Sequence, residues 1–167
     1  MKTITLFLRS ALFLSIYLLA AAAANAAPVI FIVRHAEKAT TGGGDDPDLS
    51  LAGQKRADAL ARILNDSQIT AVFVTEFNRT QETAAPTARA AHVRPTVVPA
   101  NDLPGLVARL RGLSGNALVV GHGNTIPGLV KALGITTSIN IPDDDYSEIF
   151  VVSLHDPPQL LRLHYPF

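Results

Sequence analysis

Four side chains that follow predicted strands could together carry out phosphate chemistry. Arg34 and His35 come directly after the apolar run 28–33, whose β-branched residues are typical of a buried strand. Arg79 and His122 each follow another run of the same kind. A guanidinium presents a planar fork of donors to the oxygens of an anion, and a neutral imidazole can act as a nucleophile or carry a proton. These residue types indicate a site for a phosphoryl group.

The elements that must position these side chains alternate between strands and helices. Strands are predicted over 28–33, 69–74, 93–98, 117–120, 148–154 and 160–165. Helices are predicted over 51–65, over 78–91 with Pro86 as a kink or restart, over 103–110, and up to residue 133. The alternation predicts an α/β fold with a mainly parallel sheet, and the last two strands, with no helix between them, predict an antiparallel edge. Because the carboxyl ends of parallel strands meet at one edge of a sheet, we expect the four side chains to converge.

The converged side chains suit a tetrahedral dianion better than a metal ion. A divalent cation would be repelled by the two guanidinium groups, which stay charged at neutral pH, so we expect no metal at this site. Arg34, Arg79 and His122 can instead donate to phosphate oxygens. The same positive charges disfavour protonation of His35, which leaves it neutral and able to attack phosphorus.

Three sequence blocks resemble the signatures of a known family. They are Val-Arg-His-Ala-Glu-Lys at 33–38, Thr-Glu-Phe-Asn-Arg-Thr-Gln-Glu-Thr-Ala at 75–84 and Val-Val-Gly-His-Gly-Asn-Thr at 119–125. In this order they resemble the histidine phosphatase superfamily, also called phosphoglycerate mutase-like. The resemblance implies a three-layer sandwich of helices around the sheet and a phosphohistidine intermediate on His35. It also implies a phosphate pocket of Arg34, Arg79 and His122, with neither metal nor cofactor.

The proton donor to the leaving group is the remaining assignment. The family usually supplies a carboxyl group between the second arginine and the second histidine, and some small members that act on phosphohistidine work without one. Asp102, in a predicted polar loop, is the candidate, and Glu82, within the predicted helix, is the rival. Asp102 could instead only cap the helix that follows it.

The first 26 residues have the layout of a secretory signal peptide. Basic residues precede an apolar run, and small residues surround the expected cleavage after Ala26. We therefore expect one domain over 27–167, located in the periplasm or secreted, with no stable membrane insertion after cleavage. The chain has no cysteine, which excludes disulfides and thiolate sites. Its 14 basic residues balance 14 acidic ones, so there is no broad basic surface for nucleic acid.

These features predict an exported, metal-independent phosphatase that hydrolyses a small phosphomonoester through a phosphohistidine on His35. Phosphorylated envelope sugars are a candidate substrate class because the expected compartment contains them. Two alternatives stay open: a phosphohistidine or phosphoprotein phosphatase, and a phosphate-binding module without turnover. The sequence makes no prediction of an oligomeric state.

Overall fold

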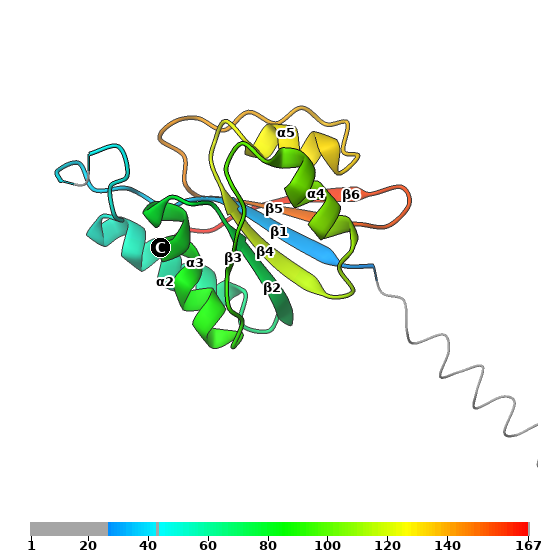
Figure 1. The fold of residues 1–167 in the computed structure, drawn as a ribbon, viewed down its shortest axis with the longest axis horizontal. Coiled ribbons are helices and arrows are strands. Elements are labelled where there is room, and N and C mark those ends of the chain that lie inside the picture. Colours follow the sequence, from blue (N-terminus) through cyan, green and yellow to red (C-terminus); the bar gives the residue numbers. More distant parts are fainter. Residues whose placement is uncertain (1–26, 43, 167) are drawn as a thin grey trace, which may run out of the picture.

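A six-stranded sheet lies between two layers of helices in the computed structural model, which describes residues 27–42 and 44–166. The strand order is β3-β2-β4-β1-β5-β6. Helices α2 and α3 lie on one side of the sheet, and α4 and α5 lie on the other (Figure 1). This arrangement confirms the predicted α/β sandwich. The predicted signal peptide over 1–26 falls outside the described residues.

Four strands pair in parallel, as predicted. They are β1 (Val29–Arg34), β2 (Ile69–Val74), β3 (Thr96–Val97) and β4 (Asn116–Gly121). Strand β3 is shorter than the predicted run 93–98: only Thr96 and Val97 pair with β2. Pro95 directly precedes β3 and has no N–H to donate to a ladder, which accounts for the late start of pairing.

The other edge of the sheet is antiparallel. Strand β5 (Glu148–Ser153) runs antiparallel both to β1 and to β6 (Gln159–His164). Its pairing with β1 places the segment before β5 beside the carboxyl end of β1, because Val33 pairs with Ile149. The closing hairpin therefore borders the edge where Arg34 lies.

Four helices connect these strands in the described part of the chain. They are α2 (Leu51–Ile63), α3 (Asn78–Ala90), α4 (Leu103–Arg111) and α5 (Ile126–Ala132). Helix α2 begins after Ser50, whose hydroxyl accepts a hydrogen bond from Gly53 N at 3.1 Å. Pro86 lies inside α3 without ending it, so the predicted restart does not occur. None of the helices in the described residues is long and apolar enough to cross a membrane.

Two apolar cores hold the sheet rigid between its helices. Side chains alternate between the faces of a strand, so Ile32 packs in the core that includes α4 and α5 residues, while Val33 packs in the core that includes α2 and α3 residues. Val119 and Val120 of β4 divide in the same way. Since both faces are packed, the residues at the strand ends are presented from a fixed support.

Candidate active site

The register of β1 and β4 places two histidines side by side. Arg34 pairs with Gly121, so the residues that follow them, His35 and His122, leave the sheet at the same level. The ladder continues for one more hydrogen bond, from His35 N to Gly121 O at 2.9 Å. The two imidazole centroids lie 5.4 Å apart. Both residues are buried, with 6% and 7% of their surface exposed.

Arg34 is fixed by the loop before β5. Its Nη1 donates to the carbonyl oxygens of Pro142 at 2.9 Å and Asp143 at 2.8 Å, and the guanidinium lies 4.2 Å from the centroid of Tyr146. Its Nε is buried and has no hydrogen-bond partner among the described residues. A buried N–H without a partner costs free energy unless something accepts its hydrogen bond. A phosphate oxygen would be such an acceptor.

Arg79 joins the two histidines from the first turn of α3. Its guanidinium lies 4.3 Å from the centroid of Phe77, and Phe77 in turn meets the ring of His122 edge to face, with centroids 5.3 Å apart. The positive charges of Arg79 and Arg34 both act on His35 and His122. We call the group Arg34, His35, Arg79 and His122 the histidine socket. The structure thus brings together the four residues expected to converge.

A carboxylate that sequence reasoning missed already contacts Arg79. Asp46 Oδ1 lies 3.3 Å from Arg79 Nη1, and the same oxygen accepts from Asn78 N at 3.0 Å. Asp46 belongs to the glycine-containing loop between β1 and α2, 33 positions before Arg79 in the chain. In this structure a carboxylate accepts the hydrogen bonds that an anionic ligand would also seek.

Replacing Asp46 with asparagine is expected to tighten phosphate binding two- to fivefold. The variant removes the negative charge that competes for Arg79, and a partly exposed ion pair of this kind contributes about 1 kcal/mol or less. Calorimetric titration with inorganic phosphate measures the change, and Asp45→Asn is the matched control because its carboxylate makes no ion pair with Arg79. Weaker binding to Asp46→Asn would mean that Asp46 helps the site to hold its anion.

The hydrogen bond of His35 fixes which ring nitrogen is reactive. Its Nδ1 lies 2.8 Å from Ala36 O, and because a carbonyl oxygen can only accept, Nδ1 carries the proton. Burial is the largest cause that lowers the pKa of His35 to about 4; the hydrogen bond to Ala36 O opposes it, and the electrostatic effects of His122, Arg34 and Arg79 act in the same direction as burial. At neutral pH the ring is therefore uncharged, with a lone pair on Nε2.

Threonines orient the ring of His122, and its charged neighbours shift its pKa. Its Nε2 lies 3.1 Å from Thr75 Oγ1, which lies 3.0 Å from Thr80 Oγ1. Burial, and after it the charge of Arg79, lowers the pKa of His122 to about 4, while the charge of Glu76 acts in the opposite direction. A bound dianion would offset the arginine charges and favour the protonated ring. His122 can then donate to a phosphate oxygen.

Stability is expected to decrease as the pH is lowered from about 6.5 to about 4. In this window an unfolded histidine binds a proton, whereas His35 and His122 in the folded protein do not, so protonation favours the unfolded state. Thermal unfolding at pH 7, 5.5 and 4.5 measures the effect. The double variant His35→Gln, His122→Gln should lose less stability over this range than the unaltered protein. Equal losses would show that other groups control the pH dependence.

The carboxyl candidates for proton donation occupy different places. Asp102 caps α4 by accepting from Gly105 N at 2.9 Å, and it lines a cavity that Thr75 also lines. Glu82 accepts from Leu49 N at 2.7 Å and lines a groove between α2 and α3 instead. Glu76, which sequence reasoning did not single out, acts electrostatically on His122. Its position directly after β2 is the signal that could have identified it.

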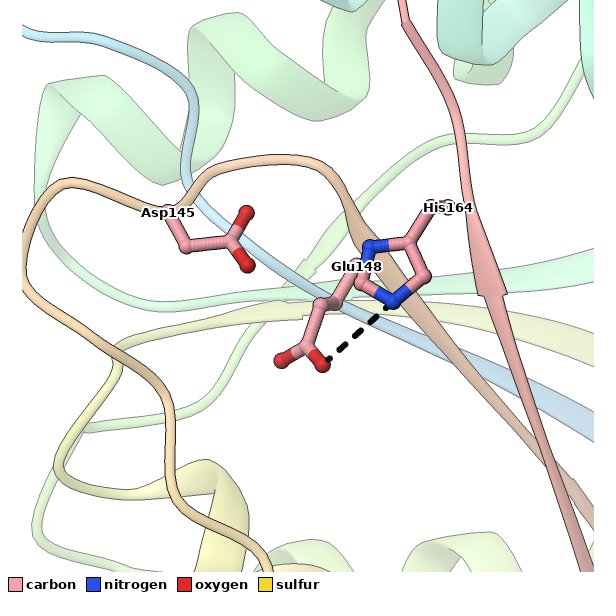
Figure 2. Close-up of side chains that lie close together, drawn as sticks. All are labelled: Asp145, Glu148 and His164. Atoms are coloured by element: carbon pink, nitrogen blue, oxygen red, sulfur yellow. Dashed lines mark ion pairs between the residues drawn. The ribbon is translucent and has the colours of Figure 1, made fainter.

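A second polar cluster, formed by Asp145, Glu148 and His164, lies beside the antiparallel edge (Figure 2). These are residue types that can ligate a metal. However, Arg162 Nη2 pairs with Glu148 Oε1, and His164 Nε2 lies 4.0 Å from the same oxygen. The guanidinium already neutralises this carboxylate and would repel a cation. We interpret the cluster as support for the loop whose carbonyl groups bind Arg34.

Comparison with protein families confirms the resemblance predicted from the motifs. The family model of the histidine phosphatase superfamily (branch 1) matches residues 30–103. This range contains Arg34, His35 and Arg79 and ends before His122. No curated protein matches the chain in sequence.

Solved structures with the same fold include several phosphatases. The protein histidine phosphatase SixA, solved with tungstate, has a TM-score of 0.67 and 22% identity, covering 81% of this chain and 96% of its own. A mycobacterial glucosyl-3-phosphoglycerate phosphatase has a TM-score of 0.62 and 14% identity, covering 83% and 98%. A putative alpha-ribazole-5'-P phosphatase from Escherichia coli has a TM-score of 0.64 and 16% identity, covering 83% and 97%. These neighbours confirm the fold, and the family match supports a phosphatase enzyme.

Proposed function

We propose that this protein is an exported phosphatase that hydrolyses phosphomonoesters, without a metal ion, through a phosphohistidine on His35. The observation that carries the proposal is the neutral, buried His35, whose Nε2 lone pair is free beside two arginines and a second histidine. The arginines supply the positive charge that a metal ion would provide in other phosphatases. Arg34 Nε, Arg79 and His122 bind the phosphate oxygens.

The proposed reaction has two displacements at phosphorus. In the first, His35 Nε2 forms a bond to phosphorus while the bond to the ester oxygen breaks, and Asp102 gives a proton to the departing alkoxide. In the second, a water oxygen bonds to phosphorus as the bond to Nε2 breaks, and the proton lost by water returns to Asp102. The products are an alcohol and inorganic phosphate. The arginines stabilise the charge spread over the phosphoryl oxygens in both steps.

The compartment and the neighbours supply candidate substrates. Export would expose the protein to phosphorylated envelope sugars, which makes phosphosugars one candidate class. The likeness to SixA supports the alternative of a phosphohistidine or phosphoprotein substrate. A phosphate-binding module without turnover is the remaining alternative, because Asp102, the proposed proton donor, accepts from Gly105 N and contacts no residue of the histidine socket in the described part of the chain.

Turnover of a generic aryl phosphate tests the proposed activity. We expect the purified protein to release inorganic phosphate at the same rate with and without a chelator. Loss of turnover on chelation would contradict the metal-independent mechanism. Phosphate binding without any turnover would favour the binding module.

Export is tested separately, by fractionating cells that express the full sequence. We expect the protein in the periplasm or the medium, with Ala27 as its first residue after cleavage behind Ala26. An intact N-terminus in the cytoplasmic fraction would contradict export and would bring cytoplasmic phosphoproteins back as substrates.

A further inference from the structure

An apolar cavity of about 250 Å³ opens next to the histidine socket. It lies among the carboxyl ends of β2 and β4, the segment that leads into α4, and the first turns of α5. Leu106 of α4 and Leu129 of α5 are among the many apolar side chains that line it. Pockets for drug-sized ligands have volumes of roughly 300–1,000 Å³, so this cavity is sized for a smaller group, such as one aromatic ring or a short hydrocarbon chain.

The cavity and the socket share a wall. Thr75 lines the cavity, and its hydroxyl lies 3.1 Å from His122 Nε2. Gly121 also lines the cavity, and its carbonyl accepts the hydrogen bond of His35 N. The cavity therefore adjoins the socket through these two residues, although none of the four socket side chains lines it.

The lining selects against a sugar. Each hydroxyl of a buried sugar needs a hydrogen-bond partner, and burying one without a partner costs roughly 1–3 kcal/mol. The polar side chains in the lining are Thr75, Asp102, Asn124 and Thr125. Thr75 is already engaged with His122, Asp102 caps α4, and the Thr125 hydroxyl donates to His122 O. Few partners are left for a polyhydroxyl group.

We propose that the substrate carries a compact apolar leaving group, aryl or short alkyl, that binds in this cavity. The inference rests on the proposed phosphatase function and narrows its substrate class. The sugar of a phosphorylated sugar would not bind in the cavity, so we expect such sugars to be poorer substrates. Asp102 lines the same cavity, so a leaving group bound there would lie close to the proposed proton donor.

Gly128 lines the cavity, so a larger side chain at this position can narrow it. A Cβ built at this position meets only Leu103 Cδ2, at 3.7 Å, so a larger side chain would extend toward α4 without a clash at its base. Gly128→Leu is thus the test variant. Gly112→Leu is the matched control, because Gly112 is exposed as Gly128 is and also has room for a Cβ, but it lies at the end of α4 and does not line the cavity.

The experiment compares kcat/KM on benzyl phosphate, glucose 6-phosphate and acetyl phosphate, whose acyl group is small. Benzyl phosphate carries one aromatic ring, and it releases a primary alkoxide as glucose 6-phosphate does, so the comparison reports how the leaving group is bound. We expect the unaltered protein to prefer benzyl phosphate to glucose 6-phosphate by about tenfold or more. Gly128→Leu should reduce the ratio of benzyl to acetyl phosphate activity by about tenfold, while Gly112→Leu should not change it. A preference for glucose phosphate, or equal ratios in both variants, would overturn the inference.

Binding of phosphonates separates this inference from the proposed function. Phosphonates have no ester bond to hydrolyse, so their binding does not depend on turnover or on any variant. Calorimetry should show benzylphosphonate binding the unaltered protein about tenfold more tightly than methylphosphonate. Equal affinities would contradict the apolar cavity site. Tight benzylphosphonate binding with no turnover of any ester would instead contradict only the phosphatase activity.

Discussion

Replacement of His35 by alanine is expected to reduce phosphatase activity by about 10³-fold or more and to abolish the phosphoenzyme. The variant removes the Nε2 lone pair that attacks phosphorus, while Arg34, Arg79 and His122 remain to bind phosphate. Binding of inorganic phosphate should therefore be retained. The loss is expected in kcat, because the missing interaction forms only as the reaction proceeds.

Trapping with radiolabelled aryl phosphate measures the intermediate directly. The unaltered protein should acquire a label that is lost in acid and retained in base, as expected of a phosphohistidine. His155→Ala is the control, because His155 is exposed and lies outside the histidine socket. A label that persists on His35→Ala at the level of the control would show that another residue is the nucleophile.

The convergence of the socket was predictable because it depends on strand ends. Apolar runs followed at once by Arg34, His35 and His122 are visible in the sequence, and parallel pairing then brings their ends to one edge. His35 and His122 lie side by side because the residues before them, Arg34 and Gly121, pair in the sheet. Once the strands were placed, the positions of these three residues required no information about loops, whereas Arg79 lies in the first turn of α3.

Asp46 and the carbonyl groups that hold Arg34 were missed because their positions depend on loop conformations. Asp46 reaches Arg79 from a glycine-containing loop, and the carbonyl groups around Arg34 come from the irregular segment before β5. Such contacts join distant positions with no periodic pattern to reveal them. Pro86 shows a different effect, since it stays within α3, where packing of α3 against α2 outweighs one lost backbone hydrogen bond.

Replacement of Asp102 by asparagine is expected to slow hydrolysis of an alkyl phosphate by about 10²-fold or more, with a much smaller loss on an aryl phosphate. An alkoxide is a poor leaving group and needs a proton as it departs, whereas an aryloxide does not. Asparagine keeps a side-chain oxygen to accept from Gly105 N, so α4 stays capped and the folded state is preserved. Rates of phosphate release from matched alkyl and aryl esters measure the difference.

Glu76→Gln provides the comparison that assigns the proton to one carboxyl group. Glutamine also keeps an acceptor for Ala100 N, which Glu76 Oε2 binds at 2.8 Å. Because the Glu76 charge raises the pKa of His122, we expect this variant to change the rates on both esters by a similar factor. A loss confined to the alkyl ester in Glu76→Gln, and absent from Asp102→Asn, would transfer proton donation to Glu76. The leaving group would then depart toward Glu76, which follows β2, rather than toward Asp102 at the start of α4.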